Sequence, residues 1–181
     1  MLRNLITILL LSIILVSCEK SNTDNNGVKS IEDLLVKNNE ITGWTYSGAG
    51  WVANNISELT NYIDGLADVF QRYGFNEASY QLYVGAINSA QVELRLTVYN
   101  LGTNENVKSL TADQAISLVG GIQWTNGAGE FAQYARYNGL SQELIFYRDK
   151  YYVNITIMAD TEESLNIIKQ FALNVDGKIK K

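Results

Sequence analysis

Residues 92–99 read VELRLTVY, and this stretch decides the fold. Val92, Leu94, Leu96 and Val98 alternate with polar or aromatic residues, which is the period of a strand with one buried face. Such alternation is typical of antiparallel sheets, because the strands of parallel sheets are buried on both faces. The segment therefore predicts an antiparallel sheet whose aliphatic face packs against helices.

Further strands are expected on both sides of this segment. They share short alternating or apolar runs that are bounded by turn residues. The predicted strands cover residues 79–84, 92–99, 130–137, 143–148 and 151–158. Asp149 and Lys150 predict a tight hairpin between the last two. The sheet is therefore expected to have about five strands.

The first predicted helix covers residues 56–73. Asn55 and Glu58 form a capping-box pattern at its start, and apolar residues then recur at helical spacing. Gly74 stands where a left-handed residue ends a helix, and Phe75 follows at the position of the hydrophobic contact in a Schellman motif. The pattern predicts one continuous amphipathic helix.

Two further helices are expected, over residues 112–119 and from Asp160 to a stop at Gly177. The order of helices and strands lacks the regular strand-helix-strand alternation of a parallel sheet. We therefore predict an α+β fold, a twisted antiparallel sheet of about five strands with helices packed on one face.

Composition excludes several kinds of site. The chain has 181 residues, 46% of them hydrophobic, a formal charge of -5, no His and one Cys. Without His there is no Ser-His-Asp triad and no His metal ligand, and one Cys forms no internal disulfide or thiolate zinc cage. The negative charge disfavours nucleic acid as a partner. We predict no metal and no cofactor.

The N-terminus predicts an export signal. A short positive stretch precedes a mostly apolar run over residues 5–16, which is too short to span a bilayer. Residues 15–18 read LVSC and resemble a bacterial lipobox, in which the Cys becomes the lipidated first residue. We predict that Cys18 carries the lipid; the alternative is a plain secretory signal followed by an unrelated thiol.

The predicted organisation follows from this site. Residues 1–17 form a lipoprotein signal peptide, residues 18–39 a polar tether with a short helix, and residues 40–181 a single domain. The mature chain then has 13 basic and 19 acidic residues. A membrane contact through the lipid and a place in the cell envelope are expected. Glu19, in place of Asp, favours the outer membrane.

One resemblance covers most of the domain. Residues 62–68 read YIDGLAD and residues 73–75 read YGF, which resembles the Y-I-N-G-A-A-E … Y-G-F signature of an uncharacterised family of bacterial exported proteins and lipoproteins. Gly43-Trp44 and residues 144–153 are similar to further motifs of that family, in the same order. Asp64 replaces its Asn. The resemblance implies a fold and an envelope location but no reaction.

Two acidic residues are candidates for chemistry. Asp64 and Asp68 are four residues apart on the predicted helix and would project from one face. Paired carboxylates bind Ca²⁺ or act as acid and base on a glycosidic bond. No Asp-rich loop supplies further calcium ligands. The alternative is a solvated flank of an amphipathic helix.

Aromatic residues are the other candidates for ligand contact. Trp51 and Trp124 lie beside glycine-rich stretches at 47–50 and 126–129, which are expected to be mobile loops. Tyr99 and Tyr152 are expected on the sheet face opposite the aliphatic residues, where rings stack on sugars or receive a protein. The alternative is that these aromatic residues simply suit strands.

These observations favour a non-enzymatic envelope lipoprotein that binds a ligand or partner, such as a glycan or an envelope protein. The alternative is a glycan-active hydrolase that uses paired carboxylates, Asp64 and Asp68. No nucleophile motif supports an enzyme, since neither G-x-S-x-G nor S-x-x-K places a nucleophile in the context that catalysis requires.

Overall fold

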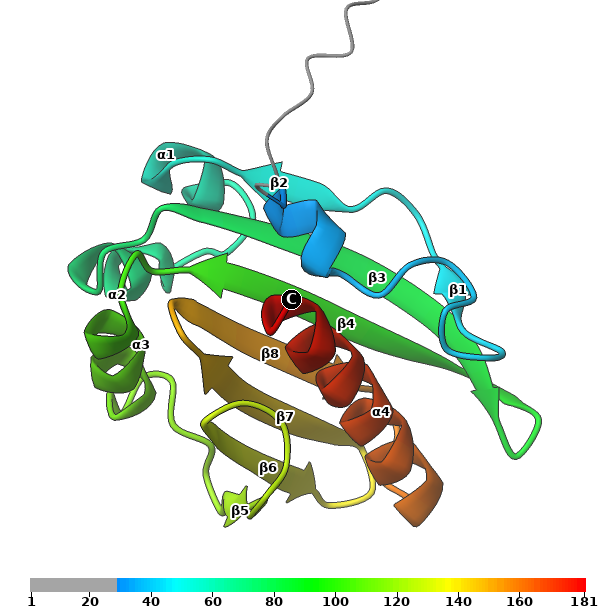
Figure 1. Cartoon of the computed structure of the whole chain (residues 1–181). Helices are drawn as coiled ribbons and strands as arrows, with labels where there is room; N and C mark the ends of the chain where they lie inside the picture. The colour runs from blue at the N-terminus through cyan, green and yellow to red at the C-terminus, as the bar shows by residue number, and fades with distance from the viewer. Residues whose placement is uncertain (1–28) are drawn as a thin grey trace, which may run out of the picture.

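A computed structural model describes residues 29–181 (Figure 1). The elements in chain order are η1 (Ile31–Leu34), β1 (Thr45–Tyr46), β2 (Trp51–Ala53), α1 (Ile56–Thr60), α2 (Ala67–Arg72), β3 (Glu77–Ile87), β4 (Ala90–Asn100), α3 (Asn104–Thr111), β5 (Ile122–Gln123), β6 (Phe131–Tyr137), β7 (Ser141–Arg148), β8 (Tyr151–Ile157) and α4 (Glu162–Ile179). Cys18 and the predicted signal peptide lie outside the described residues. Between residues 29 and 181, no helix combines the length and apolarity that a membrane span requires.

The strands form one antiparallel sheet in the order β1-β3-β4-β8-β7-β6-β5, with β2 also paired to β3. The α+β class is confirmed, but the expected number of about five strands is wrong, because the sheet has eight. The additional strands β1, β2 and β5 have two or three residues each. A segment that short shows no period in the sequence, and its pairing with β3 or β6 defines it.

One face of the sheet packs against α4, and we call it the α4 face. Leu94, Leu96 and Val98 of β4 join Ile168 and Phe171 of α4 in one buried cluster, as the alternation predicts. Figure 1 shows α4 lying across this face, with η1 beside its C-terminal end. Because residues 31–36 contribute buried side chains to the same cluster, the folded unit begins before residue 40.

The opposite face carries a second core at one end. Here α1, α2 and α3 pack over Tyr99, Tyr152 and Ile145. Phe70 of α2 stacks on Tyr99 with ring centroids 4.1 Å apart. The expectation of helices on one face is therefore wrong. The physical reason is that these rings offer apolar area that three short helices cover.

The helix expected over residues 56–73 is two helices. Gly65 has φ +76° and separates α1 from α2, so a left-handed residue interrupts the apolar stripe. The stop after α2 is confirmed as a Schellman motif: Gly74 has φ +73°, its N–H donates to the Gln71 carbonyl, and the Phe75 N–H donates to the Phe70 carbonyl.

The other two helices also differ in their limits. The helix expected over residues 112–119 is wrong, because α3 begins at Asn104, where the Thr103 hydroxyl caps the Asn106 N–H at 3.2 Å. The last helix begins after Thr161, which forms a capping box with Ser164, and continues through Gly177.

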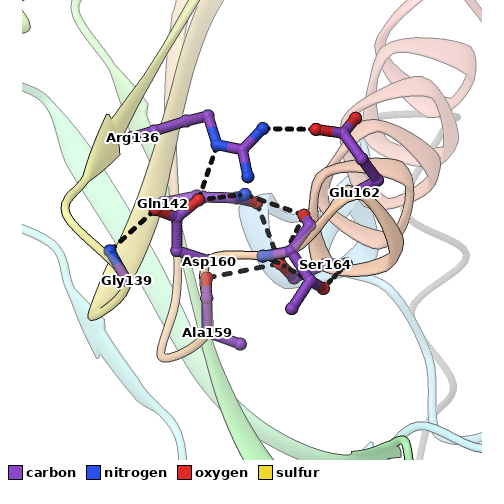
Figure 2. Close-up of polar contacts among 8 residues, drawn as sticks. Arg136, Gly139, Gln142, Ala159, Asp160, Glu162 and Ser164 are labelled. Carbon is purple, nitrogen blue, oxygen red and sulfur yellow. Dashed lines mark hydrogen bonds and ion pairs between the residues drawn. The ribbon is translucent and has the colours of Figure 1, made fainter.

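A polar network fixes the start of α4 on the sheet (Figure 2). Gln142 of β7 is fully buried, and its amide donates to Asp160 Oδ1 and to the Thr161 carbonyl, each at 2.9 Å. Arg136 pairs with both Asp160 and Glu162. Hydrogen bonds from Gln142, from the Gly139 N–H and from Arg136 lower the pKa of Asp160 to about 2. The cluster serves as a structural anchor, since its polar groups bond one another.

Candidate functional site

The second face is hollowed into two neighbouring recesses, one of which borders the second core. The first has a volume of about 330 Å³ and the second about 230 Å³. We call them together the open-face groove. The first recess is lined by Trp51, Tyr62, Ile63, Tyr80, Leu82, Arg95 and Thr97. The second is lined by Leu66, Phe70, Tyr99, Ala115, Ile116, Glu143, Tyr152 and Asn154.

Strand register makes the floor of the groove continuous. Tyr80, Thr97 and Asn154 are direct partners across β3, β4 and β8. Arg95 is the partner of Thr156, which in turn pairs with Glu143 of β7. Directly opposed residues lie side by side on one face, with Cβ atoms about 5 Å apart. The two recesses therefore share one floor that crosses four strands.

Three aromatic rings form one end of the groove, and we call them the aromatic platform. Trp51 and Tyr80 are cross-strand partners whose rings stack with centroids 5.3 Å apart. Tyr62, from the loop between α1 and α2, stacks on Trp51 at 4.4 Å with an interplanar angle of 3°. Tyr62 is 48% exposed, so the platform presents aromatic surface to solvent.

Charged groups at the platform end are balanced. Arg95 reaches the Glu93 carboxylate at 3.9 Å, and both side chains are about half exposed. A contact of that length between exposed groups contributes little to stability. The guanidinium of Arg95 is therefore available as a hydrogen-bond donor at the edge of the first recess.

The second recess has a polar floor. The Asn154 amide donates to Glu143 Oε1 at 2.5 Å, and the Tyr137 hydroxyl donates to Glu143 Oε2 at 3.3 Å. The hydroxyl of Tyr152 lies beside the Asn154 side chain, and that of Tyr99 beside Thr97. Burial raises the pKa of Tyr99 and of Tyr152, so both phenols stay protonated donors at neutral pH.

The walls of the second recess are apolar. Phe70 is buried beneath the recess, while Leu66 and Ala115 are exposed at its rim and Ile116 is half-buried. These side chains come from α2, from the residue before it and from the turns after α3. The recess therefore combines apolar walls with hydroxyl, amide and carboxylate groups on one floor, which is the usual composition of a small-ligand site.

The sequence-predicted residues are distributed over different parts of the molecule. Trp51 lines the first recess, and Tyr99 and Tyr152 lie at the base of the second. The open aromatic face expected at Tyr99 and Tyr152 is wrong in one respect, since they are only 6% and 2% exposed beneath α2. Trp124 packs against the core of the α4 face, with Lys169 Nζ 5.4 Å from its ring centroid.

The expected pair of carboxylates is not brought together by one helix. Asp64 lies in the loop that contains Gly65, whereas Asp68 lies in α2, and both are exposed. Neither residue lines the open-face groove. The assumption of a shared helical face is therefore wrong, because the left-handed Gly65 ends the helical path between them.

Sequence reasoning missed Glu143 and Asn154 as groove residues. The alternation over residues 92–99 does place Arg95 and Thr97 on the face opposite the aliphatic core, so part of the groove floor could be predicted from the sequence. The hairpin predicted at Asp149 and Lys150 pairs β7 with β8. The pairing of β8 with β4 had no signal, because strand order does not follow from the period of a single strand.

Within the described part of the chain, no group of three or more His, Cys, Asp or Glu residues is arranged to hold a metal ion. Comparisons with family models, curated proteins and solved structures found no match to the chain. The resemblance to the uncharacterised exported family stays a prediction.

Proposed function

We propose that the protein is a lipid-anchored module of the bacterial cell envelope that binds a glycan in the open-face groove without changing it chemically. The observation that carries the proposal is the aromatic platform of Trp51, Tyr62 and Tyr80 beside a polar floor on the same sheet face. A sugar ring has an apolar C–H face and a rim of hydroxyl groups, so it fits a site with both features.

The acceptors and donors of the floor support this ligand class. Thr97, Asn154 and Glu143 offer hydroxyl, amide and carboxylate groups within one band of the sheet. The hydroxyl and the amide can donate to and accept from sugar hydroxyls, whereas the carboxylate accepts from them. Each well-formed hydrogen bond contributes about 0.5–1.5 kcal/mol net, and stacking on an aromatic ring adds a similar amount.

The distribution of carboxylates favours binding over hydrolysis. Glycosidases generally use two carboxylates that flank the scissile bond. Glu143 supplies the one carboxylate among the residues that line the groove, and both of its oxygens already accept hydrogen bonds. Asp64 and Asp68, on which the hydrolase alternative depended, lie outside that lining.

A glycan array probed with the detergent-solubilised full chain tests the binding proposal. We expect Tyr62→Ala to weaken glycan binding about tenfold, because it removes the exposed ring of the platform. The matched control is Tyr46→Ala, which removes a ring of similar exposure from β1, outside the groove. An array without any bound glycan, or one whose glycans are cleaved, contradicts the proposal.

The proposed lipid anchor at Cys18 has a separate test. We expect Cys18→Ser to leave the precursor without acyl chains and to release the protein from membrane fractions, because two or more acyl chains hold a protein firmly to a bilayer. Intact-mass measurement detects the missing lipid. Unchanged membrane partitioning with an unchanged mass contradicts the anchor and leaves the groove argument intact.

A further inference from the structure

We propose that the second recess of the groove is a subsite for the acetamido group of an N-acetylated amino sugar. This inference rests on the proposed glycan-binding function and narrows it to one ligand class. Two features of the recess carry the inference. Leu66 and Ile116 form an apolar wall, and the hydrogen-bonded pair of Glu143 and Asn154 lies on the floor.

An acetamido group has three distinct parts, and the recess offers a counterpart to each. Its methyl group fits the apolar wall formed by Leu66, Ala115 and Ile116. Its N–H needs an acceptor, which Glu143 supplies through its remaining lone pairs. Its carbonyl needs a donor. The phenols of Tyr99 and Tyr152 lie at the base of the recess and are protonated donors.

Other substituents fit the same recess less well. A plain hydroxyl group leaves the apolar wall without a contact, so it loses the contribution of a buried methyl group. A carboxylate approaches Glu143, the one acid in the recess, and no Lys or Arg is among the residues that line it. Because like charges at short range repel, the recess discriminates against acidic sugars.

The position of the recess suits an oligosaccharide. The aromatic platform stands over β2 and β3, and Glu143 lies on β7. From β3 through β4 and β8 to β7 there are three inter-strand spacings, about 14 Å in all. A short chain that lies across the strands therefore stacks one ring on the platform while another places its acetamido group in the second recess.

The test compares two trisaccharides by isothermal titration calorimetry with the full chain in detergent. Triacetylchitotriose carries an acetamido group on each ring, whereas cellotriose has hydroxyl groups at those positions. We expect triacetylchitotriose to bind at least tenfold more tightly. Equal affinities, or tighter binding of cellotriose, overturn the acetamido subsite but leave glycan binding standing. If neither binds while the array shows other glycans, the subsite is also overturned.

Variants locate the selectivity. Ala115→Phe fills the second recess, and we expect it to lower the affinity for triacetylchitotriose at least tenfold with little effect on cellotriose. Ala112→Phe is the matched control, because Ala112 is exposed in the same segment but does not line the recess. Equal affinities of these two variants for triacetylchitotriose contradict the subsite.

A second variant keeps the proposal testable if Ala115→Phe fails to fold. Glu143→Gln preserves the shape of the side chain but replaces a charged acceptor with a neutral amide. We expect a several-fold loss of affinity for triacetylchitotriose and a smaller loss for cellotriose. A change of equal size for both trisaccharides assigns Glu143 to a hydroxyl contact and overturns its role in the subsite. Thermal melting checks that each variant is folded.

Discussion

The two faces of the sheet use the same strands for different purposes. On the α4 face, one helix of 18 residues covers rows of Leu, Ile and Val side chains. On the second face, three short helices cover the row that contains Tyr99 and Tyr152 together with Ile145 of the next row. The other positions of that face carry Arg95, Thr97, Asn154 and Glu143. The α4 face is covered by α4, whereas the second face keeps the open-face groove.

The difference shows how stability and binding are divided within one domain. Residues in a sheet alternate between faces, so each strand contributes to the core and to the groove at the same time. The aliphatic rows on the α4 face supply most of the buried area, which lets the second face keep polar groups in half-buried positions. Substitutions on the two faces test this division.

The largest effect is expected for Phe171→Ala on α4. Phe171 is fully buried and meets Trp44 and Tyr83 edge-on, with centroids 5.7 and 4.9 Å away. Truncation of a buried Phe costs about 3–5 kcal/mol of unfolding free energy. Leu173→Ala on the same helix is 50% exposed and serves as the control, with a change within about 0.5 kcal/mol. Denaturant unfolding measures both, and similar midpoints contradict the core assignment.

A smaller loss is expected at Gly74, which ends α2 on the second face. Gly74→Val places a β-branched residue at φ +73°, and its Cβ meets Asn106 Nδ2 at 2.5 Å. We expect a loss of about 1–3 kcal/mol. Gly139 has a similar φ, but no atom lies within 4 Å of a Cβ added there. The difference in stability between Gly74→Val and Gly139→Val therefore measures the cost of the steric clash. Equal melting temperatures show that Asn106 moves aside without cost.

The anchor of α4 is expected to depend on pH. The folded pKa of Asp160, about 2, lies below its ordinary value of 3.8, so the unfolded chain takes up the proton first as the pH falls. Asp160 therefore stabilises the fold above about pH 4, and this stabilisation is lost between about pH 4 and pH 2.

Asp160→Asn tests that dependence. The variant is expected to be less stable at pH 7, with a difference from the wild-type chain that narrows toward pH 2. Asp64→Asn removes the same charge from an exposed loop and is the control. Urea midpoints measured from pH 2 to pH 7 provide the readout. A difference that is constant across that range contradicts the role of the carboxylate.

The smallest effect on stability is expected for Tyr62→Ala in the groove. Tyr62 is 48% exposed and contacts Trp51 only as the outer ring of the platform. We expect the free energy of unfolding to change by about 0.5 kcal/mol or less while glycan binding weakens. A loss comparable to that of Phe171→Ala would place the platform in a core rather than in a site.

Local patterns predicted the parts of the fold that depend on neighbouring residues in the sequence. The alternation at residues 92–99 and the stop at Gly74 and Phe75 are both confirmed, because strand period and the Schellman motif are properties of a few consecutive residues. The break at Gly65 also had a signal. A glycine within a helical stripe is unfavourable, and a change of backbone direction explains it better than close packing.

Other features depend on tertiary contacts that a single pattern does not contain. Thr103 and Thr111 each precede apolar residues at helical spacing, so either could begin a helix. The helix begins after Thr103 because Val107 and Leu110 are then buried in the second core. The groove needs the order of β3, β4, β8 and β7, which is set by how the strands pair. Trp51 was predicted as a contact, while Glu143 had no signal of its own.

Because α4 is the last element of the chain, the sheet is synthesised before the helix that covers it. Every strand that α4 covers is synthesised before it, so the Leu and Ile rows of the α4 face lack the helix that covers them until the chain has been extended past Phe171. A partly made chain therefore presents an extended apolar sheet surface, the kind that aggregates. Because α4 and the first strands are far apart in the sequence, the closing step is a long-range contact and is expected to be slow. A chaperone that holds the growing chain would act on the face that the mature protein hides.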